Sequence, residues 1–267
     1  MTIGYKTIKA ESSGGVMAIR LSRPQVRNAF NPELIRELKE AVRAAEGDGT
    51  LRVITLRGEG GTFCSGGDLN WMKESLTYSD RENYEDAENL YALFETLDQC
   101  RLPIVGGVDG FALGGGVGLV SVCDYVVADR EARFSLSEVR VGLVPACIGP
   151  FVLRKIGESN ARALFLSSER FTADRALQIG LIHEVADAVD GADGVAGAMD
   201  RVTQSILAAS PNAISVAKTF IRSLTRTAPG SQGALAVRTL ADIRVTGEAQ
   251  EGLRAFLEKR PPAWKNP

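Results

Sequence analysis

Blocks of apolar residues separated by polar stretches predict that strands and helices alternate through the first half of the chain. Apolar residues recur at helical spacing between Leu34 and Ala45, directly after Asn31-Pro32, where asparagine caps a helix and proline fits its first turn. We expect this helix to end at Gly47. A second helical stripe lies in the polar stretch 77–99 and consists of Leu90, Leu93, Phe94 and Leu97. Compact apolar runs predict strands over residues 5–11, 16–21, 51–56, 103–108 and 124–128.

The order strand, helix, strand, helix, strand favours an α/β architecture with crossover connections. After Pro150 the pattern becomes mostly helical, with helix starts expected at Thr172-Ala173 and Ser210-Pro211 and one strand over residues 181–185. We therefore divide the chain into a core over residues 1–200 and a C-terminal helical lobe over residues 201–267, which together form a single functional unit.

Composition narrows the class of protein. The 267 residues carry 31 Lys and Arg against 33 Asp and Glu, so no overall basic field favours nucleic acid. Four widely spaced cysteines form no CxxC pair, which favours reduced thiols. Neither a signal-peptide core nor an apolar run of membrane-spanning length occurs. We expect a cytoplasmic protein with no nucleic-acid or membrane partner.

His183 is the single histidine of the chain. A multi-histidine zinc site is therefore excluded, and we expect no metal at the site. Because His183 falls in an expected strand far from the glycine-rich motifs, we assign it a structural or interface role. Chemistry must then come from carboxylates, backbone amides or bound ligands.

The common glycine-rich signatures are missing. The stretch 110–118 contains no G-x-G-x-x-G, and no Lys-Ser or Lys-Thr pair follows it, so it does not predict a dinucleotide site or a P-loop. No G-x-S-x-G nucleophile elbow occurs either.

Two loops of similar construction remain, FCSGGDL over residues 63–69 and LGGG over residues 113–116. Each follows a predicted strand and precedes a helical pattern. Small residues there allow a ligand to approach the backbone, and the first amides of a helix carry a positive partial charge. Two such amides pointing at one atom would form an oxyanion hole. The alternative is that these glycines only make tight turns.

Glu138 is the candidate acid or base, because it lies among apolar residues in FSLSEVRVGLVP. Burial in such surroundings would raise the pKa of its carboxyl, which suits proton transfer. The alternative is a helix-start glutamate or half of a surface salt bridge.

Taken together, these motifs resemble the crotonase (enoyl-CoA hydratase/isomerase) family. The order FCSGGDL, DGFALGGGVGL, FSLSEVRVGLVP and EGLRAFLEKRPPAW carries the resemblance, which runs from Arg23 to Trp264. It implies an α/β fold, a spiral of ββα units with a C-terminal helical lobe. It also implies a homotrimer or a hexamer of paired trimers, an acyl-CoA thioester substrate, and no cofactor beyond the coenzyme A of that substrate.

The resemblance also implies roles for single residues. The amides of Ser65 and Gly115 would bind the thioester oxygen, and Glu138 would act as the acid and base. Lys259, with Arg260, would reach the coenzyme A phosphates of its own or a neighbouring subunit; the alternative is a solvated helix end. The implied substrate-binding residues are Val26, Ala29, Ser65, Gly66, Gly67, Asp68, Leu69, Gly114, Gly115, Gly118 and Lys259. Trp71 and Met72 would either wall the acyl pocket or belong to the core, and Cys64 and Cys147 would be packing residues.

One departure from the family pattern affects the expected reaction. Hydratases of the usual type hold water between two glutamates, and Gly118 stands at the position of the first one. A single carboxylate suits an isomerase, whereas hydration would need Glu138 to deliver the proton while a neighbouring polar group or the substrate orients the water. Finer similarity, in DLNWMK and SEVRVGLVPACIGPFVLRKIG, is to the methylglutaconyl-CoA hydratase branch of leucine catabolism, whose substrate carries a distal carboxylate. We expect that carboxylate to replace the missing glutamate in part.

The sequence thus predicts an enoyl-CoA hydratase acting on a 2-enoyl-CoA. Two alternatives remain open: an enoyl-CoA isomerase that uses Glu138 alone, and a non-catalytic acyl-CoA-binding or RNA-associated scaffold.

Overall fold

The computed structural model describes residues 4–187 and 194–265. Within them, six strands form one sheet in the order β1-β2-β3-β4-β6-β9, and the short β5, β7 and β8 form a second sheet. The β1–β2 and β7–β8 pairs are antiparallel, and the other pairs are parallel. The strands are β1 Ile8–Ser13, β2 Val16–Leu21, β3 Val53–Gly58, β4 Ile104–Val108, β5 Phe111–Leu113, β6 Tyr125–Asp129, β7 Arg133–Ser135, β8 Phe171–Thr172 and β9 Glu184–Ala186.

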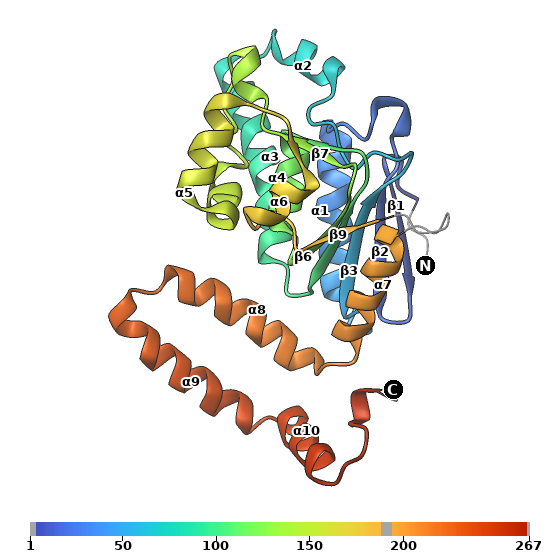
Figure 1. Cartoon of the computed structure of the whole chain (residues 1–267), viewed down its shortest axis with the longest axis vertical. Coiled ribbons are helices and arrows are strands. Elements are labelled where there is room, and N and C mark those ends of the chain that lie inside the picture. Colours follow the sequence, from blue (N-terminus) through green and yellow to red (C-terminus); the bar gives the residue numbers. More distant parts are fainter. Residues whose placement is uncertain (1–3, 188–193, 266–267) are drawn as a thin grey trace.

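Helices cover both faces of the six-stranded sheet (Figure 1). Helix α7 lies on one face, where Val53, Val105 and Val127 point toward Val195 and Met199. Side chains alternate between faces along a strand, so the intervening residues enter the larger core with α1, α3 and α4 on the other side. The helices are α1 Pro32–Gly47, α2 Leu69–Ser75, α3 Asp80–Gln99, α4 Gly115–Val122, α5 Gly149–Ser167, α6 Ala173–Gln178, α7 Gly194–Leu207, α8 Pro211–Arg226, α9 Gln232–Arg244 and α10 Gly247–Leu257.

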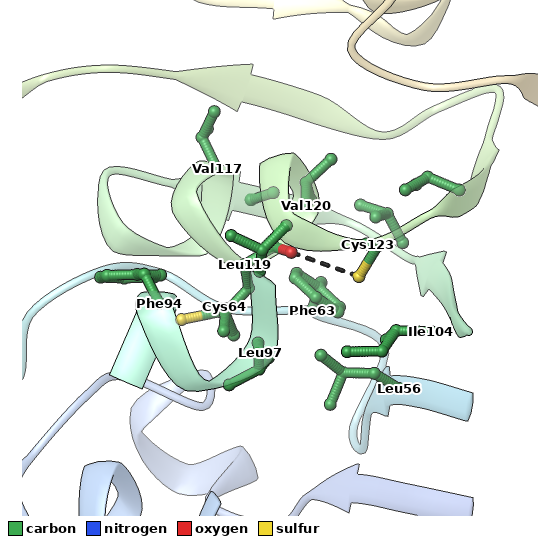
Figure 2. Close-up of a cluster of buried hydrophobic side chains, with 14 of the residues drawn as sticks. Leu56, Phe63, Cys64, Phe94, Leu97, Ile104, Val117, Leu119, Val120 and Cys123 are labelled. Atoms are coloured by element: carbon green, nitrogen blue, oxygen red, sulfur yellow. Dashed lines mark hydrogen bonds between the residues drawn. The ribbon is translucent and has the colours of Figure 1, made fainter. Parts of the chain in front are cut away.

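The larger core supports the start of the first glycine-rich loop and helix α4, which follows the second loop (Figure 2). Phe63 and Cys64 pack against Phe94 and Leu97 of α3 and against α4, which carries Leu119. The thiol of Cys123 donates to the Leu119 carbonyl at 3.2 Å. Both loops therefore rest on a close-packed base that holds their backbones in place.

The predicted elements are largely confirmed. The Asn31 cap, with its side chain accepting from the Leu34 amide, and the helix end at Gly47 are both observed. The strand expected over 5–11 lies at Ile8–Ser13, and the one expected over 181–185 lies at Glu184–Ala186. The short β5, β7 and β8 were not predicted, because two or three residues are too few to show a period.

The boundary expected after residue 200 falls inside α7, which packs on the sheet. The helices that leave the sheet begin with α8 (Figure 1). None of the described helices is long and apolar enough to cross a membrane. Over the same residues, His, Cys, Asp and Glu side chains form no group of three or more that could hold a metal ion.

Candidate active site

A cavity of about 490 Å³ opens where the two glycine-rich loops meet α2, α3 and the segment after β7. Several of its apolar residues are strongly exposed, among them Leu69, Val141 and Val144. Such residues at the mouth of a cavity suit a ligand with an apolar chain. The lining residues are Phe30, Ser65, Gly66, Gly67, Leu69, Trp71, Met72, Ser75, Asp86, Leu90, Gly114, Gly115, Ser137, Glu138, Val141, Leu143, Val144, Pro145, Ala146, Cys147 and Ile148.

The two loops run side by side as a parallel pair. The Cys64 amide donates to Phe111 and the Leu113 amide donates to Cys64, each at 2.9 Å. Gly66 has a φ of 91°, and a Cβ on it would lie 3.1 Å from the Leu113 carbonyl oxygen. Glycine is needed there because the conformation is left-handed and the second loop is close.

The amide of Ser65 is not available to a ligand, since it donates to the Arg27 carbonyl at 3.0 Å. The prediction that Ser65 is an oxyanion donor is therefore wrong for this structure. Gly67 lies two residues after Ser65. On one side of it the Gly66 carbonyl accepts from the Phe30 amide, and on the other the Asp68 amide donates to the Phe30 carbonyl. No described residue accepts from the Gly67 amide itself.

Gly115 begins α4, so its amide has no partner within the helix. No acceptor for it occurs elsewhere in the part of the chain that the structure describes. A Cβ at Gly115 would lie 2.8 Å from Cε2 of Phe30, which excludes a larger residue. Gly67 and Gly115 thus both line the cavity with an unpaired amide.

Glu138 begins the short 3-10 helix Glu138–Val141 and points back toward the start of α4. A Cβ built on Gly114, whose φ is 49°, would lie 3.0 Å from Oε1 of Glu138. Its other oxygen, Oε2, is buried and has no hydrogen-bond partner among the described residues. Burial raises the pKa of Glu138, as the sequence predicted. A carboxyl suited to proton transfer therefore lies beside the glycine loops.

Gly118 lies inside α4, is buried, and does not line the cavity. A Cβ there would lie 2.4 Å from Cγ2 of Ile148 and 2.7 Å from Cε1 of Phe94. These two side chains fill the space beside Gly118, and a contact of Gly118 with substrate stays a prediction. They would also have to move before a second glutamate could fit.

Val26, Ala29 and Asp68 support the loop instead of lining the cavity. Asp68 forms an ion pair with Arg23 at 2.7 Å and caps α2 through the Asn70 amide. Ala29 is buried, and the Val26 carbonyl accepts from the Ser65 hydroxyl at 3.3 Å. A contact of Val26 or Ala29 with coenzyme A stays a prediction.

Lys259 follows α10 and does not line the cavity of its own chain. Arg260 pairs with Glu251 and Glu258, each at 2.7 Å, and the Arg260 guanidinium lowers the pKa of Glu251 to about 2. Binding of coenzyme A phosphates by Lys259 stays a prediction for an assembled protein.

Sequence reasoning missed Asp86, a second carboxylate on the cavity wall. Its Oδ1 accepts from Nε1 of Trp71 at 3.1 Å. Trp71 and Met72 both line the cavity, although Trp71 is also largely buried. The available signal was spacing, because Asp86 lies one helical turn before Leu90 on the same stripe.

His183 and Cys64 have structural roles. Nδ1 of His183 accepts from the Val126 amide at 3.0 Å, and its ring stacks on Tyr125. Burial lowers the pKa of His183 to about 4, so the ring is neutral at pH 7. Burial raises the pKa of the Cys64 thiol to about 12, which leaves it unreactive. Cys147 is half-buried on the cavity wall.

The fold and the site define an α/β protein in which two amides without acceptors among the described residues lie beside one buried carboxyl. The model of the enoyl-CoA hydratase/isomerase family matches residues 11–267, and the chain belongs to this family. The 2,3-dehydroadipyl-CoA hydratase of Escherichia coli is 32% identical over 257 residues, covering 94% of this chain and 95% of that protein. A probable enoyl-CoA hydratase of Rhodobacter capsulatus is 35% identical over 266 residues, covering 97% and 98%.

A solved structure supports the same placement. The crystal structure of an enoyl-CoA hydratase from Shewanella pealeana matches with a TM-score of 0.92 and 33% identity, covering 97% of this chain and 96% of that one. The α/β crotonase fold, with two sheets and C-terminal helices, is thereby confirmed.

Proposed function

We propose that this protein is an enoyl-CoA hydratase that adds water to a 2-enoyl-CoA thioester. The observation that carries the proposal is the position of Glu138. Its carboxyl is buried, with one oxygen against Gly114 and the other without a partner in the described residues, beside the unpaired amides of Gly67 and Gly115. A buried carboxyl next to two such amides argues against a non-catalytic scaffold.

In the proposed reaction, the Gly67 and Gly115 amides donate to the thioester oxygen. That oxygen gains negative charge as water attacks C3, and fixed amides there lower the barrier by roughly 3 kcal/mol each. Protonated Glu138 gives its proton to C2. Its other oxygen takes a proton from the attacking water, so the residue ends as it began. The Ser137 hydroxyl, on the same cavity wall, is the polar group that orients the water.

A second function, double-bond isomerisation, is favoured by one observation. Ile148 and Phe94 leave no room for a side chain at Gly118, so the site works with one carboxyl beside the amides. Moving a double bond from C3 to C2 needs only one group that removes a proton and returns it.

The finer prediction, a 3-methylglutaconyl-CoA-like substrate, has less support. Among the described lining residues there are two carboxylates, Glu138 and Asp86, and no Lys, Arg or His. A distal carboxylate on the substrate would therefore meet no cation there.

The proposed assembly is a homotrimer or hexamer, in which Lys259 of one copy reaches coenzyme A bound to another. It is supported by large apolar side chains that the C-terminal helices expose, such as Val237, Leu253, Phe256 and Leu257. The proposed location is cytoplasmic.

The test is to incubate the protein with crotonyl-CoA, 3-methylglutaconyl-CoA and a 3-enoyl-CoA while following the absorbance of the conjugated thioester. Loss of absorbance with a conjugated substrate supports hydration, and a gain with the 3-enoyl substrate supports isomerisation instead. A protein that turns over none of the three would contradict both reactions.

A further inference from the structure

Asp86 lies on the apolar stripe of α3, at a position where the helical spacing predicts an apolar residue. Leu90 follows it by four residues and also lines the cavity, and Leu93 and Leu97 continue the same stripe into the core. The neighbouring Glu85 and Glu88 are exposed, whereas Asp86 is partly buried. Asp86 therefore places a charge-bearing group on the wall that receives the apolar chain of a ligand.

A structural role uses only one oxygen of this carboxylate. Trp71 is largely buried, and its indole N–H needs an acceptor, which Oδ1 of Asp86 provides at 3.1 Å. The amide oxygen of an asparagine would serve equally well. The other oxygen, Oδ2, accepts from no residue in the ranges 4–187 and 194–265. Support of Trp71 thus leaves the charge of Asp86 unexplained.

Asp86 lies in a part of the cavity away from the reacting groups. Burial raises the pKa of Cys147 and the negative charge of Asp86 adds to the rise, and the Cys147 thiol contacts the carbonyl of Ala87, the residue after Asp86. Glu138 instead lies against Gly114 at the start of α4, whereas Asp86 accepts from Trp71 of α2. The cavity therefore has a reacting end at Glu138 and a second end at Trp71, Asp86 and Cys147.

We propose that Asp86 is a specificity-determining residue, an inference that rests on the proposed function. It selects enoyl-CoA substrates with uncharged acyl chains over those that end in a carboxylate. A chain whose thioester oxygen is bound at Gly67 and Gly115 extends past Leu90 to the far end of the cavity. A terminal carboxylate would there face Asp86, and no cation among the described lining residues offsets the repulsion. An uncharged chain instead packs against the apolar wall.

The test compares two substrates with six-carbon acyl groups, 2-hexenoyl-CoA and 2,3-dehydroadipyl-CoA, of which the second ends in a carboxylate. The wild-type protein should have the higher kcat/KM for 2-hexenoyl-CoA. Asp86→Asn removes the charge and keeps an acceptor for Trp71, so the ratio of kcat/KM for 2,3-dehydroadipyl-CoA over 2-hexenoyl-CoA should rise at least about tenfold. Asp86→Glu keeps the charge and should keep the wild-type ratio.

Glu88→Gln is the matched control, because it removes a negative charge from an exposed position of the same helix and should leave the ratio unchanged. An unchanged ratio in Asp86→Asn overturns the proposal, as does a wild-type protein that prefers the dehydroadipyl substrate. Binding of hexanoyl-CoA and adipyl-CoA, measured by calorimetry, needs no turnover. If the protein hydrates neither substrate but Asp86→Asn still strengthens adipyl-CoA binding relative to hexanoyl-CoA, the proposed function fails and the role of Asp86 stands.

Discussion

Helices α1 and α8 have the same local design and different surroundings. Each has 16 residues, starts with proline and is capped by a side chain, Asn31 for α1 and Ser210 for α8. Each also has apolar residues on one face. Helix α1 buries most of that face against the sheet and α3, whereas α8 buries none of its residues fully.

An amphipathic pattern therefore predicts a helix but does not predict which surface covers the apolar face of that helix. Polar contacts attach α8 to the rest of the chain: Lys218 donates to Leu102 at 2.9 Å and to Asp124 at 2.6 Å, and Arg222 donates to Asp98 at 2.7 Å. Exposed apolar residues of α8 to α10, such as Ile221, Leu240 and Phe256, are left for another surface. In the proposed assembly that surface is a second copy of the chain.

The largest expected effect comes from shortening one isoleucine in each helix. Ile35 is 2% exposed and Ile221 is 62% exposed. Ile35→Ala should lower the free energy of unfolding by about 2–5 kcal/mol, because it leaves a cavity in the core. Ile221→Ala should change the stability of the chain itself by less than about 0.5 kcal/mol. Urea unfolding of both variants measures the difference.

Light scattering should also show that Ile221→Ala weakens assembly. Ile35→Ala should leave assembly unchanged under conditions where this variant is still folded. Equal losses of stability for the two variants at a protein concentration where the wild type is monomeric would break the comparison between the helices.

A smaller effect is expected at the helix caps. Asn31→Ala should lower the free energy of unfolding by about 1 kcal/mol, since the Leu34 amide loses its acceptor. Ser210→Ala removes the matching bond to Ala213. Its effect should appear as faster hydrogen exchange confined to α8, because that helix adds little to the core. Faster exchange across the sheet as well would contradict this separation.

The smallest effect concerns pH and Glu138. Burial raises the pKa of Glu138 in the folded protein above its value in the unfolded chain. The contribution of Glu138 to stability is therefore greatest at low pH, where the carboxyl is protonated in both the folded and the unfolded chain. It is lost as pH rises through the pKa of the folded protein. Glu138→Gln should therefore raise the free energy of unfolding at pH 7, by less than the cap substitutions change it, and alter it little at pH 4. Thermal unfolding at the two pH values provides the check. A variant less stable than wild type at pH 7 would contradict the account.

Much of the fold was predictable because its elements are long and periodic, as in α1. The glycine loops and Glu138 were predictable from residue type and family resemblance. The choice between the Ser65 and Gly67 amides was not, because it depends on the hydrogen bonds that this loop forms with Arg27 and Phe30, which come from another part of the chain. Asp86 was missed because the acidic residues around it resemble a solvated helix face.

In the proposed reaction, Glu138 transfers the proton while the Gly67 and Gly115 amides hold the thioester oxygen. The most direct measurement is the turnover of Glu138→Gln on the enoyl-CoA that the wild-type protein uses best, with Glu169→Gln, at an exposed position, as control. We expect kcat to fall by about 10²–10⁴ with a smaller change in KM, and the control to match wild type. A Glu138→Gln variant with wild-type kcat would contradict the account.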